Sequence, residues 1–166
     1  NLKLTVQATG ENSGTWGQIT NTNLLILEQA IGGYDAVGVT SGATLVFSNG
    51  ALSNGKNQVL KLTGTIAGAV NVVIPDSIEK TYIVENATSG AYTVTFKTTS
   101  GTGATWTATN KGYKILYSDG TNIVDISTDL GDITAGAITS GAITSGAIAA
   151  TGNIVPGAND TYDLGA

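Results

Sequence analysis

The sequence predicts a mainly β protein in three parts: a small N-terminal strand-loop-helix segment, an antiparallel β-sandwich, and a repeat-containing stalk. Three observations support this. Short alternating strands recur between tight turns from residue 35 to residue 126, one apolar helical run precedes them, and a five-residue repeat follows them. We place the three parts at residues 1–34, 35–127 and 128–166.

Composition supports the β class and excludes several functions. The 166 residues include 23 Gly and only 2 Pro, which is typical of strands joined by tight turns. Seven basic residues, all Lys, against twelve acids give a net charge of −5, so nucleic-acid binding is not expected. Without Cys or His, the chain lacks zinc ligands of those types, disulfides and His-based triads. No apolar run approaches the ~20 residues of a membrane span, and no cofactor is expected.

The first segment reads as a strand, a loop and a helix. Apolar residues alternate with polar ones from Leu2 to Ala8, which predicts a half-buried strand. A glycine-punctuated loop over residues 9–17 holds Trp16. Thr20 or Asn21 then caps a helix that runs to about Ile31 and stops at the next two glycines.

The predicted helix is unusually apolar. Leu24, Leu25, Ile26 and Leu27 are consecutive, and at ~100° per residue they cover most of its circumference. The helix is therefore expected to be buried on several sides, either as an ordinary core helix or against copies or a partner. Trp16 is either a core plug or an interface anchor. We predict that the partner interface comprises Trp16, Leu24, Leu25, Ile26 and Leu27.

The middle part is predicted as seven strands separated by turn signals such as Asn49-Gly50 and Asp119-Gly120. The spacing is too short for helical crossovers, which favours antiparallel pairing. The predicted strands are Thr44–Ser48, Gln58–Thr63, Ala69–Ile74, Thr81–Glu85, Tyr92–Lys97, Gly112–Tyr117 and Thr121–Ile126.

In the stalk, Gly and Ile each recur every five residues over residues 131–150. Burying four Ile side chains contributes about 10 kcal/mol, whereas ordering some twenty residues costs ~20–40 kcal/mol. The repeat therefore needs identical chains around one axis, with Ile133, Ile138, Ile143 and Ile148 pointing to that axis. The alternatives are a flexible Gly/Ala/Ser linker and a single-chain pentapeptide coil, for which four units are few.

Candidate chemistry is sparse. The acids are scattered among turns, so paired-carboxylate hydrolysis is disfavoured and no enzyme is expected. Asp125, Asp129 and Asp132, brought together on an axis, offer oxygen ligands for a hard cation, but calcium-loop spacing is missing.

Three stretches together resemble the tail-fibre and tail-spike proteins of tailed bacteriophages. They are Gly10-Glu11-Asn12 with Trp16-Gly17 and Asn21-Thr22-Asn23-Leu24, the text around Ile83–Asn86 and Lys114–Asp125, and Gly152–Pro156 with Tyr162–Gly165. The resemblance implies a homotrimer and a virion-bound end that docks on a tail, neck or baseplate protein. It also implies a receptor-binding domain for the host surface beyond residue 166, and a repeat that forms a trimeric fibre stalk.

Two functions follow as hypotheses. The first is a structural component of a virion tail fibre that attaches the fibre and projects a distal host-binding region. The alternative is a carbohydrate-binding β-sandwich that recognises the host surface directly. Sugar platforms need exposed aromatic rings. Tyr92, Phe96, Tyr113 and Tyr117 lie at strand spacing, where core burial is the simpler expectation.

Overall fold

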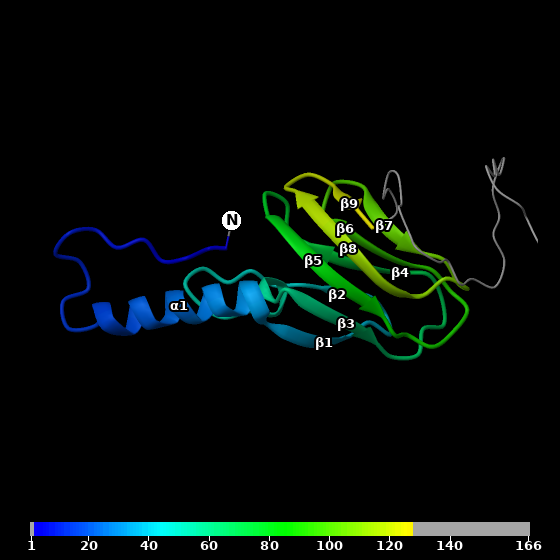
Figure 1. Ribbon diagram of the computed structural model, residues 1–166, viewed down its shortest axis with the longest axis horizontal. Helices are drawn as coiled ribbons and strands as arrows, with labels where there is room; N and C mark the ends of the chain where they lie inside the picture. The colour runs from blue at the N-terminus through cyan, green and yellow to red at the C-terminus, as the bar shows by residue number, and fades with distance from the viewer. Residues whose placement is uncertain (1, 128–166) are drawn as a thin grey trace, which may run out of the picture. The chain divides into compact units, whose positions relative to one another are not determined.

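The computed structural model describes residues 2–127, which form one α-helix, one 3-10 turn and nine strands (Figure 1). The chain divides into two compact units, residues 1–131 and 132–166, and every described residue belongs to the first. The predicted stalk, including Ile133, Ile138, Ile143 and Ile148, lies outside the described residues, as do Asp129 and Asp132.

Helix α1 spans Trp16–Gly32 and ends where the sequence predicts. It starts four residues before Thr20, because the preceding turn leads straight into it: the Thr15 N–H donates to the Asn12 carbonyl (2.9 Å) and the Ile19 N–H to the Thr15 carbonyl (3.2 Å). At its end, a Cβ on Gly33 would lie 2.3 Å from the Gln29 carbonyl oxygen, so a side chain cannot fit there. Within residues 2–127, no helix combines the length and apolarity needed to cross a membrane.

The strands form two sheets. The five-stranded sheet has the order β1-β3-β5-β8-β9, and the four-stranded sheet has the order β2-β4-β6-β7. The strands of the first are β1 (Tyr34–Gly38), β3 (Val59–Thr63), β5 (Glu79–Asn86), β8 (Gly112–Asp119) and β9 (Ile123–Asp125). Those of the second are β2 (Ala43–Thr44), β4 (Val70–Ile74), β6 (Val94–Thr98) and β7 (Gly103–Trp106), and the 3-10 turn η1 spans Asn54–Lys56.

Strands dominate as predicted, but the prediction of a wholly antiparallel arrangement is wrong, because both sheets are mixed. β1, β3 and β5 pair in parallel, as do β2, β4 and β6, while β5–β8, β6–β7 and β8–β9 are antiparallel. Parallel neighbours need a crossover, which is usually a helix. Here each crossover is a strand of the opposite sheet, since the chain alternates between the sheets from β1 to β6.

This alternation winds the chain into a coil with a nearly fixed step. Val59 of β3 pairs with Ile83 of β5, a step of 83 − 59 = 24 residues. Val70 of β4 pairs with Val94 of β6, again 94 − 70 = 24 residues. The two sheets thus advance together, one strand each per turn of the coil.

Residues 2–8 do not form the predicted strand. They run along α1 instead, where the Asn23 side chain accepts a hydrogen bond from the Thr5 N–H (3.0 Å) and donates one to the Thr5 carbonyl (2.8 Å). The Gly50 N–H donates to the Lys3 carbonyl (2.8 Å). These bonds satisfy part of the backbone that a sheet edge would otherwise pair.

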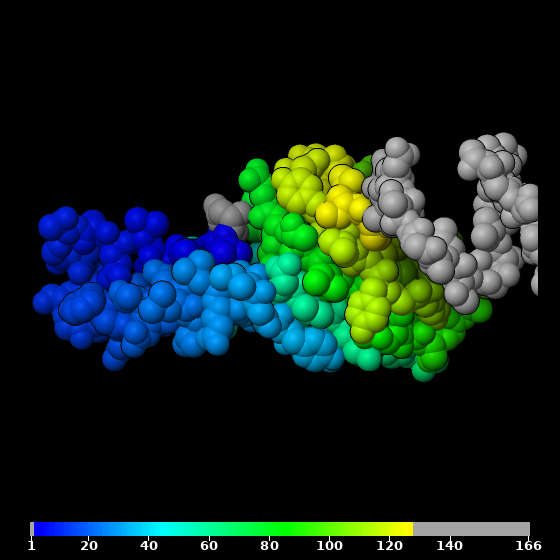
Figure 2. Space-filling model, in the orientation of Figure 1, coloured from blue at the N-terminus to red at the C-terminus, as the bar shows by residue number. Residues whose placement is uncertain are grey.

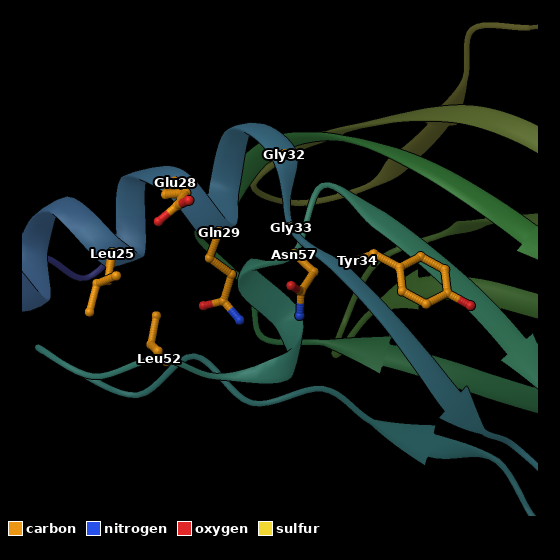
Figure 3. A pocket seen from close by; sticks show the side chains of 8 residues that line it. All are labelled: Leu25, Glu28, Gln29, Gly32, Gly33, Tyr34, Leu52 and Asn57. Atoms are coloured by element: carbon orange, nitrogen blue, oxygen red, sulfur yellow. The ribbon is translucent and has the colours of Figure 1, made fainter.

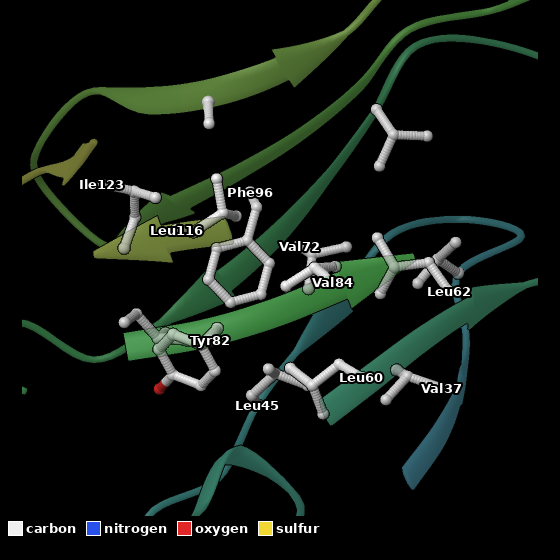
Figure 4. Packing of buried hydrophobic residues seen from close by; sticks show 14 of the residues in the cluster. Val37, Leu45, Leu60, Leu62, Val72, Tyr82, Val84, Phe96, Leu116 and Ile123 are labelled. Atoms are coloured by element: carbon white, nitrogen blue, oxygen red, sulfur yellow. The ribbon is translucent and has the colours of Figure 1, made fainter. Parts of the chain in front are cut away.

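One hydrophobic core lies between the two sheets (Figure 4). Its centre joins Tyr82 of β5 to Phe96 of β6, with ring centroids 5.3 Å apart, and Trp106 of β7 is also fully buried. The expectation of core burial holds for Phe96 and is wrong for Tyr92, Tyr113 and Tyr117, which are exposed. β8 places Tyr113 and Tyr117 on the face turned away from the core, because Leu116, on the opposite side of the strand, already fills it.

Candidate partner interface

Helix α1 buries only one narrow stripe within the described residues. Ile19, Asn23, Ile26 and Ala30 fall within an arc of about 60° at 100° per residue. Ile26 and Ala30 are buried at the centre of that stripe, and Asn23 holds residues 2–8. The expectation that the described chain covers this helix on several sides is therefore wrong.

A second apolar stripe on α1 remains open. Trp16, Leu24, Leu27 and Ile31 lie within an arc of about 80°, roughly a quarter-turn from the buried stripe. Trp16 is 64% exposed, Leu24 58% and Ile31 78%, while Leu27 is half-buried. We call these four residues the exposed stripe. An apolar stripe of this spacing is what a helix presents to a partner.

The predicted interface residues therefore have different positions. Trp16, Leu24 and Leu27 belong to the exposed stripe, Leu25 lines a groove beside it, and Ile26 is fully buried in this chain's own packing. Ile31 was missed by the sequence reasoning. Its spacing of seven residues from Leu24 is the signal that could have found it, since i and i+7 share a helix face.

The groove has a volume of about 390 Å³ and lies between the C-terminal half of α1 and the loop before β3 (Figure 3). Leu25 of the helix and Leu52 of the loop provide its apolar lining, and Glu28, Gln29 and Asn57 provide polar groups. The Ser53 N–H donates to the Gln29 side-chain oxygen (3.3 Å), which ties the loop to the helix. The groove can accept an apolar side chain flanked by hydrogen-bonding groups.

A buried lysine shapes the loop that forms one wall. Lys56 Nζ donates to the backbone carbonyls of Ser48 and Ala51, both at 2.7 Å, and its side chain is fully buried. Burial lowers the pKa of Lys56. The Tyr82 hydroxyl donates to the Gly55 carbonyl (3.2 Å), and this bond connects the same loop to the core.

A second buried lysine fixes the end of α1 to the five-stranded sheet. Lys80 Nζ donates to the Ala30 carbonyl (3.1 Å) and to the Gln58 side-chain oxygen (2.9 Å), and it lies 5.0 Å from the Tyr82 ring centre. A cation at a helix C-terminus interacts favourably with the helix dipole. Burial nevertheless lowers the pKa of Lys80 to about 8.

The acids of the described chain stabilise turns and strand ends. Asp76 accepts bonds from the Ser100 N–H (3.1 Å) and hydroxyl (2.9 Å), which lower its pKa. Asp125 pairs with Lys114, and although burial opposes ionisation, the hydrogen bonds from Lys114 and Ser127 keep the pKa of Asp125 lowered. Among residues 2–127, no group of three acids could hold a metal ion.

The arrangement suits contact between proteins. It combines an open apolar helix stripe, a groove with an apolar lining, and a helix end fixed by Lys80. Comparison of the chain with models of protein families, with curated proteins and with solved structures gave no match.

Proposed function

We propose that this chain is a structural component of a bacteriophage tail fibre, located in the virion as the virion-proximal part of a homotrimer. Its N-terminal segment docks on a tail, neck or baseplate protein, and a distal region beyond this segment contacts the host surface. The sequence resemblance suggests the setting, and the exposed stripe of α1 is the observation that carries the docking role.

The docking role follows from how α1 is held. Lys80 and the buried stripe fix one side of the helix to the sheet, so the exposed stripe is presented on a rigid element. Helices recognise grooves through apolar residues at i, i+3 and i+7, which is the spacing of Leu24, Leu27 and Ile31. Rigid presentation lowers the entropy lost on binding.

The test is a pair of surface substitutions, Leu24→Glu with Ile31→Glu. Both side chains are exposed, so the fold is expected to persist. An interface anchor contributes about 2 kcal/mol or more, which corresponds to at least ~30-fold weaker attachment. The assay mixes the purified fibre with particles that lack it and measures the fraction bound. Deleting residues 1–34 is a cruder test, because it would leave Lys80 without its Ala30 acceptor.

The matched control is Gln18→Glu with Asn21→Glu, which adds the same two charges to the polar side of the same helix. The control should attach normally. Equal attachment of both double variants would rule out α1 as the docking element, and an equal loss in both would point to net charge instead of the stripe.

The exposure of Tyr34, Tyr113 and Tyr117 favours a second candidate function, recognition of a host carbohydrate. Tyrosine rings on a sheet can stack on sugar faces. Aliphatic side chains surround these tyrosines, however, and they offer a sugar no hydrogen bonds. A glycan array probed with the whole chain tests this candidate, and binding that Tyr113→Ala abolishes would support it.

A further inference from the structure

The outward face of the five-stranded sheet is apolar across its whole width. Tyr34 pairs with Val59, Val59 with Ile83, and Ile83 with Ile115. The Ile126 N–H then donates to the Ile115 carbonyl (3.0 Å). These five side chains form one continuous row from β1 to the residue after β9.

A second row lies beside the first. Tyr117 of β8 pairs with Val124 of β9, and both are exposed; Tyr113, on the other side of Ile115, is 68% exposed. We call the two rows with Tyr113 the outer face; Figure 2 shows the yellow-green atoms of β8 at the surface. A sheet face in contact with water normally carries polar residues, so an apolar face of this extent indicates a contact surface.

The charge on the outer face is balanced. Lys61 and Glu85 lie next to each other on β3 and β5 and form an ion pair of 3.2 Å. The hydrogen bond with Glu85 raises the pKa of Lys61. A strongly charged partner would find no net charge at the centre of this face. A second face of the same composition would match it.

We propose that copies of this chain pack against one another through the outer face; this rests on the homotrimer proposed above. The position of the repeat supports this occupant. Ile126 and the first repeat isoleucine, Ile133, are 133 − 126 = 7 residues apart. Seven residues span at most ~25 Å. Copies that share an axis at the repeat therefore keep their outer faces within that reach of the axis.

The size of the face explains why the copies need the repeat. Five strands at ~4.8 Å and five residues at ~3.3 Å give an area of roughly 400 Å². A stable interface buries about 800 Å² on each partner, so the face alone is too small. Tethering through the repeat raises the effective concentration into the millimolar range, where a small apolar contact forms.

The test uses the absence of cysteine from the chain. Ile115→Cys places one thiol on the outer face, and Val124→Cys provides a second reporter at an independent position. The control, Thr105→Cys, places a thiol on the exposed side of β7 in the other sheet. Thiol alkylation is followed by mass spectrometry on the full chain, and native mass measurement gives the oligomeric state.

We expect both outer-face thiols to react at least ~10-fold more slowly than the control thiol in the oligomer, as burial of a small contact implies. The protection should disappear when Ile138→Asp and Ile143→Asp are added to break the repeat. An oligomer without protection would overturn this proposal and leave the trimer intact, whereas a monomeric unmodified chain would overturn both. Protection that appears only with added lipopolysaccharide, in intact and broken chains alike, would assign the face to a glycan and overturn the proposal.

Discussion

Lys80 predicts an unusual dependence of stability on pH. Its pKa falls from the ordinary 10.5 to about 8 in the folded protein, because the side chain is buried. Between these two values the unfolded chain binds the proton and the folded chain does not. The free energy of unfolding therefore rises as the pH increases from about 8 to 10.5, and the full cost of the buried charge is present below pH 8.

The size of the effect follows from the same values. The pKa difference of about 2.5 corresponds to at most about 3 kcal/mol. The acceptors at Ala30 and Gln58 stabilise the charged form, so about 3 kcal/mol is an upper bound. Lys80→Met should remove this contribution. The difference in unfolding free energy between the parent and Lys80→Met should then shift by up to that amount in favour of the parent from pH 7.5 to 10.5.

Urea unfolding at fixed protein concentration measures the difference. A Trp16→Phe background leaves Trp106 as the sole tryptophan, and Trp106 is buried in the core. Lys97→Met on β6 is the control, since it removes one lysine charge from the other sheet. A parent-minus-variant difference that stays flat, or that moves in favour of Lys80→Met as the pH rises, would refute the reasoning.

Two further predictions concern packing. Gly33→Ala should destabilise the fold by about 1–3 kcal/mol, because its Cβ would lie 2.3 Å from the Gln29 carbonyl oxygen. Gly17→Ala, where an added Cβ meets nothing within 4 Å, should instead stabilise α1 by about 0.5–1 kcal/mol, and thermal unfolding followed by circular dichroism compares the two. Phe96→Ala should cost about 3–5 kcal/mol and Tyr92→Ala far less in urea titrations, and equal losses would contradict the core described above.

Much of the local structure could be read from the sequence. All seven predicted strands overlap or adjoin observed ones, because their β-branched residues and turn signals are local features. β1 and β7 were missed, since Tyr34–Gly38 and Gly103–Trp106 are short and contain glycine. Parallel pairing was missed because it depends on contacts 24 residues apart, between strands whose sequences differ: Val59-Leu60 faces Ile83-Val84, but Lys61-Leu62 faces Glu85-Asn86.

The candidate site was predictable only in part. Four apolar residues in a row correctly drew attention to α1, but periodicity alone could not separate the buried stripe around Ile26 from the exposed one around Leu24. The outer face escaped for a related reason. In β8 both faces carry large apolar residues, so alternation could not show whether Tyr113 and Tyr117, or Leu116, point to the core.

The coil has a consequence for how a fold of this kind changes in size. Each turn contacts chiefly the turns beside it, and each adds one strand to both sheets. Insertion or loss of a 24-residue turn between β3 and β5 would keep every remaining strand in register, whereas a change of a few residues within a strand would turn its side chains to the wrong face. Length in this architecture is therefore gained or lost in whole turns, and the width of the sheet changes without disturbing the antiparallel strands that close it.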